Sequence, residues 1–153
     1  MDKTNVMRLL DRSGIDYSPH YYSTGLSGTE VARALGQDPG RVFKTLVTVG
    51  AAKRNYVFMI PVSEELDLKK AAAAVGEKSV AMLPQKELLP LTGYVHGGCS
   101  PIGMKKRFRT LIHFSAFDYD TVFFSAGKIG AQIEMDPRLI GKLCPTETAD
   151  LTV

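Results

Sequence analysis

The chain has 153 residues, a formal net charge of +3, and 44% hydrophobic and 23% charged residues. These values exclude a disordered or fibrous chain and predict one globular domain over residues 1–153. Its apolar runs are shorter than a membrane span, and its charged N-terminus lacks the apolar core of a signal peptide. We therefore expect a cytoplasmic protein without a membrane partner.

The first part of the chain predicts two short helices separated by an extended segment. Residues 4–13 place apolar side chains on one helical face, and Gly14 ends that helix. Residues 15–22 are expected to be extended. The segment SGTE, residues 27–30, is a capping box, which is typical of a helix start.

The middle of the chain predicts a hairpin followed by short mixed elements. Residues 41–49 and 55–62 have the composition of strands, and the polar loop between them indicates that they pair antiparallel. Alanine-rich residues 67–76 predict a helix with an aspartate at its start and a glycine at its end. A short strand over residues 78–83 and a short helix over residues 84–93 are expected to follow.

The last part of the chain predicts three strands and a closing helix. The strands are expected at residues 109–114, 120–126 and 131–135. Residues 136–143 begin with Asp-Pro, which favours a helix start, and we expect this helix to close the fold. Because strands outnumber the helices between them, we predict a mixed α/β domain. Its core would be a curved, mainly antiparallel sheet or barrel-like sheet surrounded by helices.

The predicted strand RVFKTLVTVG, residues 41–50, contains a lysine among apolar residues. Alternation places Val42, Lys44 and Leu46 on one face, and both faces of the strand are largely apolar. Lysine is rarely buried without a partner. Lys44 therefore either extends its ammonium group along an apolar surface to water or supplies a cation inside a pocket. Alternation alone leaves both alternatives open.

Two glycine-rich segments are candidates for the walls of such a pocket. HGGCSPIG, residues 96–103, can bring backbone amides close to a ligand. SAGKIGAQIE, residues 125–134, is either a plain turn or a second backbone wall. Neither is a nucleotide-binding fingerprint, and the chain shows no nucleophile elbow, local triad pattern or HExxH motif. The scattered cysteines and histidines lack the spacing of a zinc site, so we expect no metal and no cofactor.

The segment KKRFR, residues 105–109, contains four cations in five positions. Such a cluster is either a solvated loop or a contact for an anionic partner. The mild positive net charge permits an anionic partner without requiring one.

Four segments occur together in a specific order: RVFKTLV, LDLKKAAAAVG, GGCSPIGMKKR and SAGKIGAQIE. In this combination the chain resembles the YbaK/EbsC family, and within it the bacterial branch of Cys-tRNA(Pro) deacylases, over essentially its whole length. The resemblance implies a barrel-like sheet with helices around it. It also implies a hydrolase of mischarged aminoacyl-tRNA, related to the editing domain of prolyl-tRNA synthetase. The expected ligand is the aminoacylated 3′ end of tRNA rather than DNA, and prolyl-tRNA synthetase is a candidate partner.

The resemblance also assigns roles to residues. The implied catalytic residues are Lys44, Gly97 and Gly98. The implied substrate-binding residues are Tyr22, Thr45, Ser100, Pro101, Gly127, Gly130 and Gln132. With tRNA as the implied substrate, the KKRFR cluster predicts that Lys105, Lys106, Arg107 and Arg109 bind tRNA. Tyr21 is an alternative to Tyr22, Gln132 stands where some relatives have an aspartate, and Cys99 is expected to pack as a small apolar residue.

The implied chemistry needs no nucleophile from the protein. The cysteine thiol of the substrate can attack its own ester carbonyl and release tRNA and a cyclic thiolactone, which opens in water. Amides near Gly97 and Gly98 would stabilise the oxyanion. Lys44 would first of all anchor the terminal phosphate or ribose, and assisting the leaving oxygen or stabilising the thiolate are alternatives. Two alternatives stay open: a deacylase for Ala-tRNA(Pro) or for a broader set of aminoacyl-tRNAs, and a non-catalytic tRNA-binding module.

Overall fold

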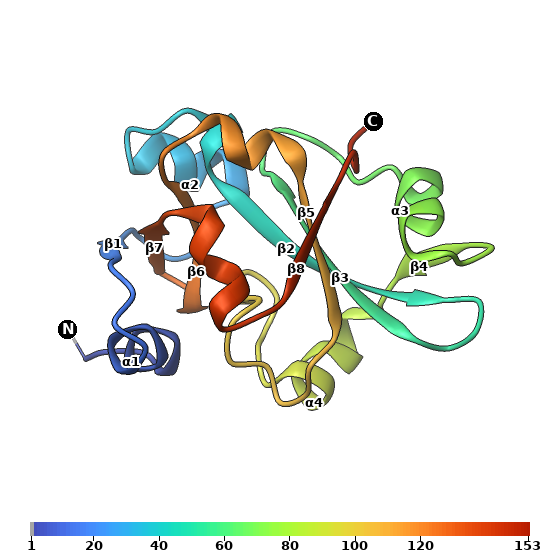
Figure 1. Cartoon of the computed structure of the whole chain (residues 1–153). Helices are drawn as coiled ribbons and strands as arrows, with labels where there is room; N and C mark the ends of the chain where they lie inside the picture. The colour runs from blue at the N-terminus through green and yellow to red at the C-terminus, as the bar shows by residue number, and fades with distance from the viewer. Residues whose placement is uncertain (1) are drawn as a thin grey trace.

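The strands of this chain form two sheets, which are joined near the middle of the molecule (Figure 1). The structure is a computed structural model that describes residues 2–153. One sheet has the strand order β1-β7-β6 and the other has the order β4-β2-β3-β5-β8. The predicted mixed α/β class with mainly antiparallel pairing is confirmed, although neither sheet closes into a barrel.

The three-stranded sheet pairs a strand near the N-terminus with two strands from the last third of the chain. Its strands are β1 (Ser18–Tyr21), β6 (Val122–Lys128) and β7 (Ala131–Met135). Both pairings are antiparallel. The pairing of β6 with β7 shifts register between Ser125 and Lys128, so β6 carries a bulge at this point. Bulges bend a strand and redirect its side chains.

The five-stranded sheet is built around the predicted hairpin. Its strands are β2 (Phe43–Gly50), β3 (Asn55–Pro61), β4 (Val80–Met82), β5 (Arg109–His113) and β8 (Thr146–Ala149). β2 pairs antiparallel with β3 and β4, which confirms the hairpin. β5 pairs in parallel with both β3 and β8.

Four α-helices surround the sheets, and their starts follow the sequence signals. They are α1 (Asn5–Arg12), α2 (Gly28–Ala34), α3 (Leu68–Val75) and α4 (Leu88–Thr92). The side chains of Thr4, Ser27 and Asp67 accept hydrogen bonds from first-turn amides of α1, α2 and α3, and Ser27 forms the predicted capping box with Glu30. Four 3₁₀ helices span Pro39–Arg41, Gln85–Glu87, Phe114–Asp118 and Pro137–Lys142.

Three apolar clusters fix how the helices cover the sheets. The largest joins α1 to the inner faces of both sheets and includes Leu10, Phe43 and Phe124. A second lies between α3 and the five-stranded sheet. The third is small and joins Ala32 of α2 to Val42 and Phe123. Since Leu46 packs against the second cluster, α2 and α3 cover the same face of β2 at different points.

Two expectations for the end of the chain were wrong in detail. The helix expected over residues 136–143 is the 3₁₀ helix Pro137–Lys142, begun by an aspartate cap at Asp136. It does not close the fold, because β8 follows and pairs with β5. β8 is short and polar, so it lacks the apolar alternation that marks a strand in sequence. None of the helices within residues 2–153 has the length and apolar character needed to cross a membrane.

Candidate functional site

Lys44 lies where the two sheets meet. A parallel bridge joins Val42, the residue before β2, to Phe123 of β6. Extending this register by two residues sets Lys44 opposite Ser125, and we infer that the two are neighbours. Phe43 and Phe124 share the main core, so Lys44 and Ser125 lie on the opposite face of their strands. On this inference, a lysine of one sheet faces the same side as a serine of the other.

The row of side chains continues across the three-stranded sheet. Ser125 pairs in register with Gln132 of β7, and Gln132 pairs with His20 of β1. Directly paired residues of antiparallel strands point to the same face. We call the set Lys44, Ser125, Gln132 and His20 the site row. It draws on four strands, and two of its members, Lys44 and Gln132, were named by the sequence analysis.

Lys44 occupies a gap between two covered patches of its sheet. Val42 is buried under α2, and Leu46 packs toward α3, while Lys44 between them is half-buried. Within residues 2–153, Lys44 belongs to none of the ion pairs. A cation placed between two helix-covered patches, without a carboxylate partner in the described chain, is suited to bind an anionic group of a ligand.

Gln132 carries an unused hydrogen-bond acceptor into the site row. Its residue is 7% exposed, and its Oε1 atom is buried without a hydrogen-bond partner among the described residues. Leaving a buried polar atom unpaired costs about 1–3 kcal/mol. A donor on a bound ligand, such as an ammonium group, would satisfy this oxygen.

Thr45 lies on the other face of β2. Its neighbours in alternation, Phe43 and Val47, belong to the main core, and its buried Oγ1 atom also lacks a partner in the described chain. The structure therefore does not bring the Thr45 side chain to the site row, and a substrate contact by this residue stays a prediction.

The two glycine-rich segments are in direct contact. A Cβ atom on Gly98 would lie 2.9 Å from the backbone nitrogen of Ile129 and 3.1 Å from the carbonyl carbon of Lys128. Only glycine can approach a backbone this closely without displacing it. The glycine loop and the β6–β7 turn therefore form adjoining walls at the end of the site row.

The two amides of this loop differ in what they can donate. The Gly98 amide donates to the carbonyl of Val95 at 3.0 Å, so it is already occupied. The Gly97 amide has no backbone acceptor among the loop and turn bonds of residues 2–153, and Gly97 is exposed with φ of +86°. Of the two predicted oxyanion donors, Gly97 is the one that this conformation leaves available.

The rest of the glycine loop is held from inside. The Tyr94 hydroxyl donates to the Ile102 carbonyl, and the buried Ser100 hydroxyl accepts from the Ile102 amide at 3.3 Å. Burial raises the pKa of the Cys99 thiol to about 12, so it stays protonated and is a poor nucleophile at neutral pH. Ser100 and the equally buried Pro101 thus shape the loop, and substrate contacts by them stay predictions.

Tyr22 and the two turn glycines lie at the same edge. The Tyr22 amide donates to the Gly130 carbonyl at 3.0 Å, which extends the β1–β7 ladder by one residue. Alternation then places Tyr22 on the face of His20, while Tyr21 lies on the other, which favours Tyr22 over Tyr21. The Gly127 amide donates to the Ser125 hydroxyl at 3.0 Å, so Gly127 and Gly130 bound the bulged turn beside the row.

The basic segment divides into two parts. Lys105, Lys106 and Arg107 are exposed in the loop before β5. Arg109 instead begins β5 and holds Glu147 of β8 with two bonds of 2.6 and 2.9 Å, and it also donates to the Val75 carbonyl at 3.3 Å. Arg109 is therefore engaged in joining α3 to β8, which argues against its predicted role in RNA binding.

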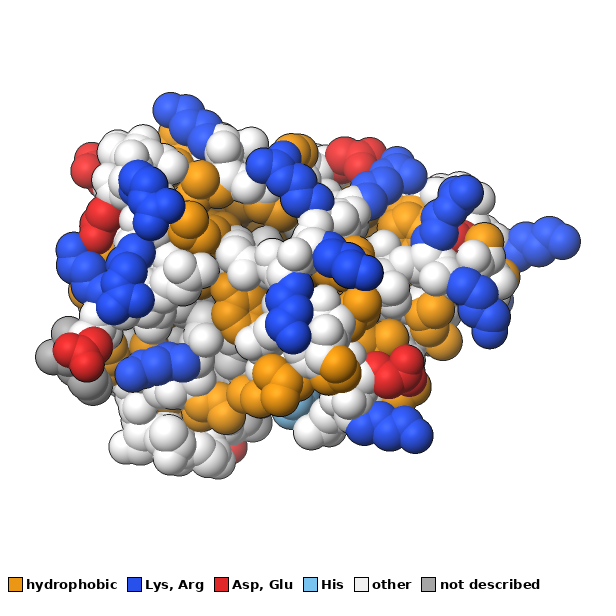
Figure 2. All heavy atoms as spheres, turned by 90° about the horizontal axis from the view of Figure 1, so that it is seen from below, with side chains coloured by type: hydrophobic (Ala, Val, Ile, Leu, Met, Phe, Trp, Pro, Cys, Tyr) orange, Lys and Arg blue, Asp and Glu red, His pale blue; other side chains and the backbone are white. Residues whose placement is uncertain are grey.

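Basic side chains gather on the lower face of the molecule. Figure 2 shows this face, which Figure 1 places around α1, α4 and the loop between α4 and β5, and it carries more Lys and Arg than Asp and Glu side chains. A surface of this kind attracts a phosphate backbone.

Two other hollows of the surface lie away from the site row. A groove of about 580 Å³ runs between the β2–β3 hairpin and α4, lined by residues that include Val49, Asn55 and Leu91. A smaller groove of about 350 Å³ adjoins Arg107 and Arg109. Neither contains a member of the site row, so the candidate site rests on register, the unpaired Gln132 oxygen and the two glycine walls.

Sequence reasoning missed His20 and did not single out Ser125. Both join the row through pairing of β1 with β7 and of β7 with β6. The Ser125 position follows from the hairpin turn once its bulge is known. The pairing of His20 with Gln132 spans most of the chain, and no local pattern indicates it.

Comparisons with known proteins give matches over most of the chain. Residues 26–143 match the family described as an aminoacyl-tRNA editing domain. A protein of Enterococcus faecalis (strain ATCC 700802 / V583), named "Putative Cys-tRNA(Pro)/Cys-tRNA(Cys) deacylase EbsC", is 46% identical over 153 residues, 98% of this chain and 93% of that protein.

Solved structures share the whole fold. One described as "a putative trans-editing enzyme for prolyl tRNA synthetase" has a TM-score of 0.84 at 26% identity, with 99% of both chains covered. The crystal structure of a hypothetical protein has a TM-score of 0.88 at 21% identity and covers 97% of this chain and 99% of that chain.

Proposed function

This chain belongs to the aminoacyl-tRNA editing domain family, and on that premise we propose that it is a trans-editing deacylase that prefers Cys-tRNA(Pro). The observation that carries the proposal is the site row. Within residues 2–153, it offers a cation outside all ion pairs at Lys44 and an acceptor without a partner at Gln132. The glycine loop adds the Gly97 amide, which has no backbone acceptor among the described loop bonds. The name of the Enterococcus faecalis relative supports the choice of a cysteine ester.

The groups of the site suit an aminoacyl ester at the 3′ end of tRNA. The Gln132 oxygen accepts a hydrogen bond from the α-ammonium group of the amino acid. Lys44 binds the terminal phosphate or the ribose oxygens as a point charge, and the Gly97 amide donates to the carbonyl oxygen as it becomes negative. A neutral glutamine replaces the carboxylate of some relatives, so the ammonium group is bound here without a full opposite charge.

The reaction proceeds within the substrate. The cysteine sulfur attacks the ester carbon, a carbon–sulfur bond forms, and the bond from that carbon to the ribose 3′ oxygen breaks. The thiol proton ends on the 3′ oxygen, which releases tRNA and a cyclic thiolactone, and water then opens the thiolactone to cysteine. The site contributes by holding sulfur and carbonyl carbon in contact, which is the kind of effect that orientation alone can supply.

Recognition of tRNA itself is expected outside the site row. Lys105, Lys106 and Arg107 are exposed in the loop before β5 and suit the phosphate backbone. Contacts to phosphates carry little sequence information, so selection of the proline tRNA would come from a complex with prolyl-tRNA synthetase. The proposal places this activity in the cytoplasm, where aminoacyl-tRNA is made.

The test is deacylation of a panel of purified esters by the whole protein. We expect fast hydrolysis of Cys-tRNA(Pro), slow hydrolysis of Ala-tRNA(Pro) and Pro-tRNA(Pro), and slow hydrolysis of Ser-tRNA(Pro), in which a hydroxyl replaces the thiol. Fast alanine and slow cysteine release would contradict the substrate. Undiminished serine release would contradict the thiol mechanism, and tRNA binding without turnover would indicate a binding module.

Lys44→Ala identifies the site in the same assay. We expect its deacylation rate to fall at least about a hundredfold, since removal of one preorganised electrostatic group commonly costs that much. Its melting temperature should stay near that of the wild type, because no described ion pair is lost. Lys69→Ala is the matched control, because Lys69 is an exposed lysine of α3, and this variant should keep full activity. Full activity of Lys44→Ala would show that the site is misplaced.

A further inference from the structure

The site row depends on how the two sheets are held together. Lys44 belongs to the five-stranded sheet, whereas Ser125, Gln132 and His20 belong to the other. Among the described residues, the backbone link between the sheets is the bridge of Val42 to Phe123. A single bridge leaves the angle between two sheets poorly determined, so side chains must contribute to fixing it.

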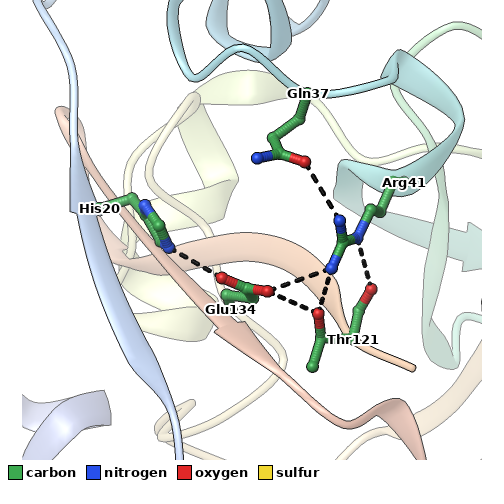
Figure 3. Close-up of polar contacts among 5 residues, drawn as sticks. All are labelled: His20, Gln37, Arg41, Thr121 and Glu134. Carbon is green, nitrogen blue, oxygen red and sulfur yellow. Dashed lines mark hydrogen bonds and ion pairs between the residues drawn. The ribbon is translucent and has the colours of Figure 1, made fainter. Parts of the chain in front are cut away.

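Arg41 spans this junction from the residue just before Val42. Its Nε donates to the Thr121 carbonyl at 2.8 Å, its Nη1 to Gln37 at 3.2 Å, and its Nη2 to Glu134 at 3.1 Å and to the Thr121 hydroxyl. Figure 3 shows these side chains pointing toward one another from separate segments of the chain. The planar guanidinium, with donors at fixed angles, sets the direction as well as the distance of its partners.

Glu134 is the centre of the cluster. It accepts hydrogen bonds from Arg41, from the Thr121 hydroxyl at 2.6 Å and from His20 Nε2 at 3.0 Å. Burial raises the pKa of Glu134, but the bonds from Thr121 and His20 and the charge of Arg41 outweigh this and hold the pKa below its usual value. The carboxylate is therefore charged at neutral pH and binds both sheets. His20 and Arg41 also pack on the Phe123 ring, at 4.9 and 5.2 Å from its centre.

The cluster lies one step along the strands from the site row. Glu134 is two residues from Gln132 on the same face of β7, and Phe123 is two residues from Ser125 on β6. Arg41 is three residues from Lys44. Two residues of a strand span about 6.6 Å, so a small rotation at the cluster displaces Lys44 relative to Gln132.

We infer that Arg41 and Glu134, with Thr121 and His20, form a positioning device that holds Lys44 in register with Gln132 for the reaction. The inference rests on the proposed deacylase function and assigns to Arg41 and Glu134 a role through Lys44 rather than contact with substrate. Misplacement of a catalytic group by about 1 Å from a remote change can cost about a hundredfold in rate.

The test compares Arg41→Lys and Glu134→Gln with the wild type by steady-state deacylation of Cys-tRNA(Pro). Arg41→Lys keeps the charge but loses the fixed fork, so we expect kcat to fall at least about tenfold while KM changes less than about twofold. The double variant should lose no more than the worse single variant, because both break one unit. If the substitution of Arg41 or Glu134 prevents folding, Thr121→Val replaces it in the test, because it removes only a hydroxyl and keeps the shape of the side chain.

The control is Arg138→Lys. Arg138 also holds a carboxylate, that of Asp136 at 2.9 Å, and a backbone carbonyl, that of Phe117 at 3.3 Å, but it lies outside the site row. Its variant should keep wild-type kcat. The inference is overturned if Arg41→Lys and Thr121→Val both keep the wild-type kcat, or if they change only KM. It is also overturned if kcat falls equally in Arg138→Lys.

A second readout separates this inference from the proposed function. If the wild type cleaves none of the esters, the proposed function is wrong. The effect of Arg41 on the position of Lys44 can still be measured directly. The NMR signal of its ¹³C-methylated amine, assigned with Lys44→Arg, should shift in Arg41→Lys and stay unchanged in Arg138→Lys. An unchanged Lys44 signal in Arg41→Lys would overturn the inference whatever the enzyme assay shows.

Discussion

At the scale of single residues, the site is marked by groups that the fold leaves unsatisfied or forces to be small. Gln132 keeps a buried oxygen without a partner in the described chain, and Gly98 lies where no side chain fits. The sequence pointed to both residues by resemblance, but it could not show why either is needed. The reasons are contacts with β6 and with the turn after it, which depend on long-range register.

Gly98→Ala tests the contact between the two glycine walls. The added methyl group would meet the backbone of Lys128 and Ile129, which cannot move aside as a flexible side chain can. We expect a loss of about 1–3 kcal/mol in the free energy of unfolding, together with reduced deacylation. Urea denaturation measures the first. Gly141→Ala is the matched control, since a Cβ there meets nothing within 4 Å; equal stability of the two variants would contradict the close packing.

At the scale of elements, local signals and long-range pairing contribute differently. Three features depend on residues that are close in sequence and were therefore predictable. They are the capping box of α2, the aspartate cap of α3 and the β2–β3 hairpin. β8 and the parallel pairing of β5 were not, because their partners are distant in sequence and β8 is short and polar. Arg109 illustrates the consequence: its local pattern predicted RNA contact, whereas the fold joins it to Glu147.

The basic loop and Arg109 should therefore respond differently to substitution. Replacing Lys105, Lys106 and Arg107 by alanine should lower the slope of log affinity for tRNA against log salt by about 2–3, if each contacts one phosphate. Arg109→Ala should leave this slope unchanged and lower the free energy of unfolding by about 0.5–1 kcal/mol, as for an exposed ion pair. Fluorescence anisotropy at several salt concentrations measures the slope; an unchanged slope in the triple variant would make the segment a solvated loop.

At the scale of the whole molecule, the far end of the five-stranded sheet is secured by a buried histidine. His113 ends β5, and its Nδ1 accepts a hydrogen bond from the Leu151 amide at 3.0 Å, just beyond β8. Burial lowers the pKa of His113 from 6.5, and the charges of Asp150 and Glu64 offset this shift only in part. The fold therefore favours the neutral ring, which alone can accept this bond.

This arrangement predicts that stability falls on mild acidification. The unfolded chain binds the proton more readily than the folded one, so the contribution of His113 is complete above pH 6.5 and is lost as the pH falls through the lower folded pKa. Urea denaturation at pH 7.5, 6.5 and 5.5 should show this loss. His113→Asn, which keeps an acceptor but does not titrate, should flatten the dependence. His96→Asn, at an exposed histidine, is the control. If the stability of His113→Asn falls with pH as steeply as that of the wild type, the assignment is wrong.

The pairing of β1 with β7 has a consequence for how the chain acquires activity. The bond between His20 and Glu134 spans 114 residues, whereas β2 and β3 are joined by a tight turn. Closing so long a loop costs more entropy than closing a hairpin, and contacts of this range slow folding. The strand that carries Lys44 can thus form early, while Tyr22 and His20 arrive with β1. We therefore expect the chain to become catalytically competent late in folding, once β1 has paired with β7.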